Sequence, residues 1–302
     1  MTLTSRRHTV AVPVAGGDLE VGVWEPAVRP EATPTVLLVH GVTSSHLAWQ
    51  QVAAALPEVR LIAPDLRGRG RSRDLAGPAG LSAHAADLAA VLDRFGVDRV
   101  LVAGHSMGAF VAVAFARLHP ERAGRLVLVD GGLPLDVPAG LDPDTMVAHI
   151  LGPTAARLSM RFADAAEYLD FWRSHPAFAH DWSSELEAYL IYDLVPGADG
   201  SLQPATTYQS VIDDTIDMNT TTAVTDALDA LAVPTRLLTV PRGLQDEEPG
   251  LYSAERLRAL LARHPGIVHE RVDGFNHYTI VMSDAGARRV ADVIEQELAA
   301  SA

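Results

Sequence analysis

Short apolar runs alternate with longer segments of helical periodicity along most of the chain. The runs Val36–Val39, Val100–Ala103 and Leu126–Val129 are continuously apolar, which is typical of strands that are covered on both faces. Between them lie Leu81–Phe95, in which apolar residues recur at helical spacing, and Ser106–Leu118, which is helix-like. Strands that alternate with helices predict right-handed crossovers and a largely parallel sheet.

The same alternation is present near both ends of the chain. Two β-rich segments flank Ala15-Gly16-Gly17-Asp18, a hairpin signal, and we expect this antiparallel hairpin to form the edge of the sheet. The other predicted elements are the hairpin strands His8–Val14 and Leu19–Trp24, helices at Ala48–Leu56, Ala254–His264 and Ala285–Leu298, and strands at Leu61–Ala63, Thr235–Val240 and Ile267–Val272. Gly96 is the expected C-cap of the helix that ends at Phe95.

Residues 131–230 interrupt this pattern, because they lack convincing strands and are rich in aromatic residues. The segments that look helical are Asp142–Leu151, Asp164–Ser174, Ser184–Leu194 and Pro204–Asp217. We therefore predict a core domain of residues 1–130 and 231–302 that carries an inserted helical cap of residues 131–230.

The segment Gly104-His105-Ser106-Met107-Gly108 is the strongest chemical signal in the sequence. A G-x-S-x-G pattern between a strand and a helix indicates a nucleophile elbow, in which a sharp turn exposes the serine hydroxyl. The glycines are needed because the strained turn leaves little space around it. Met107 begins the following helix, so its amide can donate a hydrogen bond to an oxyanion.

Three segments, in chain order, resemble the α/β-hydrolase superfamily, in its branch of serine hydrolases with a helical cap. They are His40-Gly41, Asp65–Ser72 and Gly104–Gly108. The resemblance implies an α/β fold with a mostly parallel central sheet flanked by helices. It also implies that the Val42 amide is the second oxyanion donor beside Met107, and that Asp65–Ser72 shapes a loop without a catalytic role.

The base and the acid follow from the same resemblance. His277 lies between the last predicted strand and the last helix, where the family places its base. His105 should point away from the nucleophile, and His40 should fix a loop. Two aspartates could orient His277. Asp130 follows the strand Leu126–Val129, as in haloalkane dehalogenases and mycotoxin lactonases, whereas Asp246 occupies the commoner location. We favour Asp130 and keep Asp246 as the alternative.

Composition narrows the function further. The 302 residues include 24 basic and 38 acidic ones, for a net charge of −14, which argues against nucleic acid or an anionic membrane as partner. The absence of cysteine excludes disulfides and thiolate chemistry. The polar start, Met1 to Thr9, does not resemble a secretory signal, so we expect a soluble, cytoplasmic protein. No metal or organic cofactor is expected, and no residue points to a homo-oligomer, although the cap or the sheet edge could form one.

The expected reaction is hydrolysis of a neutral hydrophobic carboxylic ester or lactone, with macrolactones of the zearalenone type as a specific candidate. Ser106 argues against haloalkane dehalogenase and epoxide hydrolase activity, since both need a carboxylate nucleophile at its position. The candidate substrate contacts from the cap are Trp172, Trp182, Tyr189 and Tyr192. The alternatives are a carbon–carbon bond hydrolase of the diketone type and a non-catalytic ligand receptor on the same fold.

Overall fold

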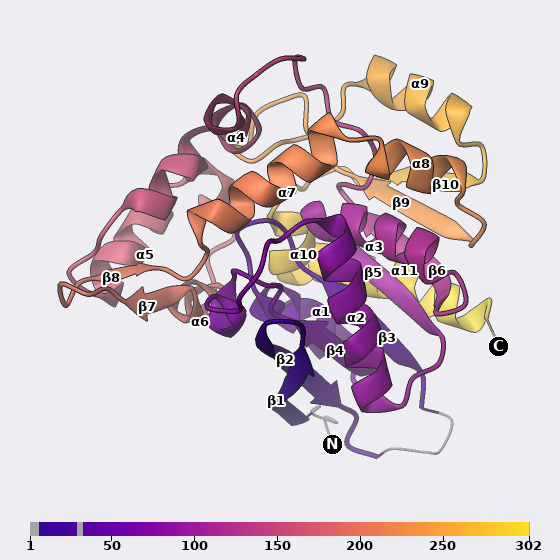
Figure 1. Cartoon of the computed structure of the whole chain (residues 1–302), viewed down its shortest axis with the longest axis horizontal. Helices are drawn as coiled ribbons and strands as arrows, with labels where there is room; N and C mark the ends of the chain where they lie inside the picture. Colours follow the sequence, from indigo (N-terminus) through magenta and orange to yellow (C-terminus); the bar gives the residue numbers. More distant parts are fainter. Residues whose placement is uncertain (1–5, 29–32, 302) are drawn as a thin grey trace.

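The computed structural model describes residues 6–28 and 33–301, so the start of the Met1–Thr9 segment lies outside the described residues. Eight strands form one sheet in the order β1-β2-β4-β3-β5-β6-β9-β10 (Figure 1). The strands are β1 (Arg6–Val14), β2 (Gly17–Glu25), β3 (Thr35–Val39), β4 (Arg60–Pro64), β5 (Val100–His105), β6 (Ala123–Val129), β9 (Thr235–Thr239) and β10 (Ile267–Arg271). Strand β2 pairs antiparallel with β1 and β4, and all other pairs are parallel. The predicted parallel sheet with an antiparallel edge hairpin is confirmed.

The continuous apolar runs are explained by two separate hydrophobic cores, one on each face of the sheet. Leu38 and Ala103 belong to the core that also includes side chains of α1 (Gln50–Ala55) and α11 (Asp284–Ala299). Their neighbours in sequence, Leu37 and Val102, belong to the core formed with α2 (Leu81–Phe95) and α3 (Met107–Leu118). Because successive side chains of a strand point to opposite faces, every residue of these strands must be apolar.

The core helices follow the sequence signals closely. They are α1, α2 (Leu81–Phe95), α3 (Met107–Leu118), α8 (Ala223–Asp229), α9 (Ala254–Arg263), α10 (Thr279–Met282) and α11. Gly96 caps α2 in the left-handed conformation, at φ 64°, as predicted. The Ser283 hydroxyl accepts from the Gly286 amide at the start of α11. The short helices α8 and α10 were not expected from the sequence.

The segment from residue 131 to 230 lies mostly to one side of the sheet. It contains α4 (Pro143–Leu151), α5 (Ala165–Arg173), α6 (Ser184–Tyr192), β7 (Leu194–Pro196), β8 (Leu202–Pro204) and α7 (Tyr208–Thr220), together with 3₁₀ turns. Helix α7 leads from this region back toward α8, which packs against α3 of the core (Figure 1). The domain boundaries at 131 and 230 stay a prediction.

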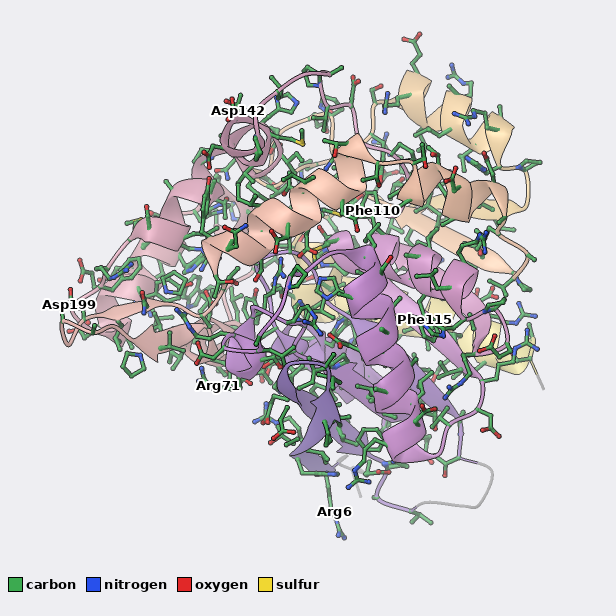
Figure 2. All side chains as sticks on the ribbon, viewed as in Figure 1. Arg6, Arg71, Phe110, Phe115, Asp142 and Asp199 are labelled. Carbon is green, nitrogen blue, oxygen red and sulfur yellow. The ribbon has the colours of Figure 1, made fainter. Side chains whose placement is uncertain are left out.

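The expectation that this segment has no strands was wrong. β7 and β8 form a two-stranded antiparallel sheet, so Leu194 and Pro204, which were assigned to helices, lie in strands. The connecting turn contains Gly197 and Gly200, the latter at φ 85°, which favours a hairpin over a continued helix. Figure 2 labels Asp199 in this turn, at the left edge of the view.

None of the helices within residues 6–28 and 33–301 combines the length and the apolar character needed to cross a membrane.

Candidate active site

Ser106 occupies a strained turn between β5 and α3. Its backbone has φ 54° and ψ −125°, a region that non-glycine residues adopt only when the surrounding structure enforces it. A Cβ at Gly104 would lie 2.2 Å from the Gly108 carbonyl oxygen, and one at Gly108 would lie 2.0 Å from the Val39 carbonyl oxygen. The backbone therefore packs too closely for any larger residue at either position, as the sequence pattern predicts.

The loop after β3 passes close to Ser106, because a Cβ at Gly41 would lie 3.1 Å from the Ser106 Cβ. The His40 imidazole accepts a hydrogen bond from the Leu66 amide at Nε2 (2.9 Å), and its Nδ1 lies 2.8 Å from the Gly41 carbonyl oxygen. The Nε2 contact requires the proton on Nδ1, which therefore donates to Gly41. Burial lowers the pKa of His40 to about 4, so the ring is neutral at pH 7.

This contact also orients the amide of Val42. The Gly41 carbonyl and the Val42 N–H belong to one planar peptide unit and point in opposite directions. His40 therefore fixes the direction of the Val42 N–H by binding the carbonyl on the other side. Val42, Met107 and Ser106 all line one pocket. The predicted loop-fixing position of His40 agrees with this geometry.

His277 is paired with Asp130. Its Nδ1 lies 2.6 Å from Asp130 Oδ2, and both side chains are buried. The other carboxylate oxygen, Oδ1, accepts from the Val240 amide at 3.3 Å. Asp246, the alternative acid, instead accepts from Asn276 Nδ2 at 2.9 Å and pairs with Arg242. The structure thus places Asp130, and not Asp246, against His277.

His105, which was expected to point away from the nucleophile, packs against His277 and lines the same pocket. Its ring centroid is 4.8 Å from that of His277, and its Nε2 donates to the His277 carbonyl oxygen at 2.7 Å. Burial lowers the pKa of His105 well below its usual range, so it is neutral. Because β5 is buried on both faces, the ring has no route to solvent and packs beside the loop that carries His277.

Ser106 and His277 line the same pocket between the sheet and the segment of residues 131–230. The cavity itself is small, about 50 Å³ when measured as the space open to the centre of a water molecule, within about 720 Å³ of non-atom space that includes open solvent. Its wall is mainly apolar and comes from several elements: Met107, Phe110, Leu135, Ile150, Leu151, Met218, Leu244, Leu251, Tyr278 and Met282. Figure 2 labels Phe110 on α3, near α7 in this view, and α7 contributes Thr215 and Met218 to the wall. Within the described part of the chain, the residues that line this pocket include no Lys, Arg, Asp or Glu.

Of the four cap aromatics predicted to contact substrate, Tyr189 alone lines this pocket. Its hydroxyl donates to Ser44 Oγ at 3.1 Å. Trp172 is buried against Phe178. The Trp182 indole donates to Glu187 at 2.7 Å, and the Tyr192 hydroxyl donates to Asp65 at 2.7 Å. These three rings hold the cap helices to one another and to the core.

The pocket residues that sequence reasoning missed carry a weak periodic signal. Thr215 and Met218 lie three residues apart on α7, and Phe110 lies three residues after Met107, a predicted site residue, on α3, so each pair shares one helix face. Nothing in the sequence shows that these two faces meet. Among residues 6–28 and 33–301, no group of three or more His, Cys, Asp or Glu side chains is arranged to hold a metal ion.

Comparison with known proteins places residues 34–234 in the family described as alpha/beta hydrolase fold. The similar proteins include "Lipase LipV" of Mycobacterium tuberculosis, 42% identical over 107 residues, which are 35% of this chain and 41% of that protein. They also include the "2-hydroxy-6-oxo-2,4-heptadienoate hydrolase" of Pseudomonas putida, 37% identical over 113 residues, 35% and 41% of the two chains. The chain thus covers less than half the length of these curated relatives.

The fold is also that of a solved structure, the "Thioesterase Domain From Curacin Biosynthetic Pathway". The TM-score is 0.73 at 22% identity, and the match covers 96% of this chain and 99% of the other.

Proposed function

Since the chain belongs to the α/β-hydrolase fold family, we propose that it is a serine hydrolase that cleaves a neutral hydrophobic carboxylic ester or lactone. The single observation that carries the proposal is the contact of His277 with the buried Asp130, at a pocket that the strained Ser106 also lines. A nucleophile, a base and an orienting carboxylate are the parts that acyl transfer needs.

In the proposed reaction, His277 Nε2 takes the Ser106 hydroxyl proton as Oγ attacks the substrate carbonyl carbon. Asp130 holds the Nδ1–H tautomer and stabilises the imidazolium that forms. The Val42 and Met107 amides bind the oxyanion. Collapse of the tetrahedral intermediate breaks the bond to the leaving oxygen, which receives the proton from His277. Water activated by His277 then hydrolyses the acyl-enzyme, and no cofactor takes part.

The pocket supports the choice of a neutral, apolar substrate. A charged substrate group would lose its hydration against the Met, Leu and Phe side chains of the wall without an ionic partner among the lining residues of the described chain. Carbon–carbon bond hydrolysis of a ring-cleavage diketone is less well supported, because such substrates carry carboxylates that cationic groups would bind. We propose a small-molecule partner, with macrolactones as the specific class to test, and a cytoplasmic location.

The test is an esterase assay of the protein beside Ser106→Ala. The substrates are p-nitrophenyl esters of increasing chain length and several lactones, macrolactones included. Turnover that disappears in Ser106→Ala, with folding checked by circular dichroism, supports the serine mechanism. Ser72→Ala is a matched control, because Ser72 is also buried but its hydroxyl accepts from the Glu20 amide, away from the pocket. A folded wild-type protein that hydrolyses none of these substrates would refute the proposal.

A further inference from the structure

Arg69 connects the loop of Val42 to the cap helix α7. The side chain is fully buried, and its guanidinium contacts four groups, one of which is the Met107 Sδ atom, 3.9 Å from a terminal nitrogen. Nε donates to the Val42 carbonyl oxygen at 2.8 Å, and one terminal nitrogen donates to the Arg67 carbonyl oxygen at 2.9 Å. The other terminal nitrogen lies 2.5 Å from Asp214 Oδ2. Because the guanidinium is planar and rigid, these contacts fix the positions of its partners relative to one another.

Asp214, on α7, is itself held from several sides. Its Oδ1 accepts from the Gly80 amide at 2.7 Å and lies 2.9 Å from His84 Nε2. Burial would raise the pKa of Asp214, but the charges of Arg69 and His84 outweigh it and lower the pKa to about 2. The carboxylate is therefore ionised at neutral pH, where it pairs with Arg69.

The two peptide units that flank the Val42 α-carbon are thus both fixed by side chains. His40 binds the carbonyl of Gly41, and Arg69 binds the carbonyl of Val42. Rotation about either backbone bond of Val42 would break one of these contacts, so the direction of its N–H depends on both. Helix α7, which supplies Asp214, also supplies Thr215 and Met218 to the pocket wall.

We propose that Arg69 and Asp214 are a positioning pair, through which α7 holds the Val42 amide in place to bind the oxyanion. The proposal rests on the function proposed above. Neither residue lines the pocket, so both act through Val42 and not on the substrate. The cap thereby supports the chemistry of the site as well as forming its wall.

The experiment compares Arg69→Lys and Asp214→Asn with the matched control Arg67→Lys. Arg67 lies on the same loop, is almost as buried as Arg69, and pairs through two contacts of 2.8 Å with Asp87 on α2. Its side chain does not contact Val42. The measurements are kcat and KM on the best p-nitrophenyl ester, the inhibition constant of a trifluoromethyl ketone, and the melting temperature. Ser106 adds to this ketone to form a tetrahedral oxyanion adduct.

We expect kcat to fall roughly 10- to 100-fold in Arg69→Lys and Asp214→Asn, a part of the 10²–10³ that one oxyanion donor supplies. KM should change by less than about threefold, and the inhibition constant of the ketone should rise by the same factor as kcat/KM falls. Lysine carries a single ammonium group instead of the rigid guanidinium fork, so it cannot contact both Val42 and Asp214. Arg69→Lys should therefore not keep the kcat of the wild type. Arg67→Lys should lower the melting temperature while kcat and the inhibition constant stay near wild type.

Equal losses of kcat in Arg67→Lys and Arg69→Lys would overturn the proposal, as would unchanged inhibition by the ketone in the Arg69 and Asp214 variants. If either single variant does not fold, Arg69→Met/Asp214→Leu removes both charges together. Full activity in this double variant would also overturn the proposal. Absence of Ser106-dependent turnover in the wild type would instead refute the proposed function itself, and this inference with it.

Discussion

Replacing Asp130 by asparagine tests the acid of the site in the most direct way. Asp130 Oδ1 accepts from the Val240 amide, and Oδ2 faces His277 Nδ1. In Asp130→Asn, the Val240 N–H therefore selects the amide oxygen, and the amide NH₂ group must face His277. That group can only donate, so His277 is forced to carry its proton on Nε2 and can no longer accept the proton of Ser106.

The expected loss is about 10⁴-fold in kcat, the effect of the wrong tautomer at a serine triad, or about 5.4 kcal/mol at 1.36 kcal/mol per tenfold. The melting temperature should change little, because the side chain keeps its shape and its bond to Val240. The assay is ester hydrolysis with purified Asp130→Asn and Asp246→Asn side by side. Asp246 contacts Asn276 and Arg242, so its variant should lose far less. A larger loss of kcat in Asp246→Asn than in Asp130→Asn would refute this reasoning and indicate that Asp246 is the acid.

Three further predictions concern packing, specificity and pH. Gly104→Ala places a Cβ 2.2 Å from backbone and should destabilise the fold by about 3 kcal/mol or more in urea unfolding; a wild-type midpoint would contradict it. Met218→Ala should shift the preferred ester toward longer chains, whereas Trp182→Ala, outside the pocket, should leave the profile unchanged. Burial holds the pKa of His40 near 4, below its value of about 6.5 when unfolded. As the pH falls, the unfolded chain therefore binds the proton first. The free energy of unfolding should decrease by about 3 kcal/mol as pH drops from about 6.5 to about 4. A free energy of unfolding that stays constant over this range would contradict a buried neutral His40 ring.

The features that sequence predicted well are those that backbone geometry imposes locally. Leu37 and Leu38 face opposite cores, so burial of both faces makes the strand apolar throughout. Ser106 is identified because its turn admits only glycine at positions 104 and 108. The strands β7 and β8 have three residues each, too few for any periodicity to appear.

Local sequence could not decide between Asp130 and Asp246, because both follow strands. In the structure the two residues also share a positive φ, at 44° and 63°. Their side chains end on neighbouring residues of one loop, His277 and Asn276. Which aspartate reaches which neighbour depends on the path of that loop in three dimensions.

Three of the four aromatic residues predicted to contact substrate do not line the pocket, and the reason bears on the substrate. Trp172 packs over the buried Arg157, with 5.2 Å between the ring centroid and the guanidinium carbon. Arg157 pairs with Asp193 and donates a hydrogen bond to the Tyr168 hydroxyl at 2.7 Å. The charge of Arg157 is thus paired with a carboxylate within residues 131–230, with aromatic rings around it. The side chains that residues 131–230 contribute to the pocket of Ser106 are mainly aliphatic, together with Tyr189, Thr215 and Met218. A wall of this kind selects substrates by shape and apolar area and penalises charge, so the burial of these aromatics is itself an argument for a neutral ester or lactone.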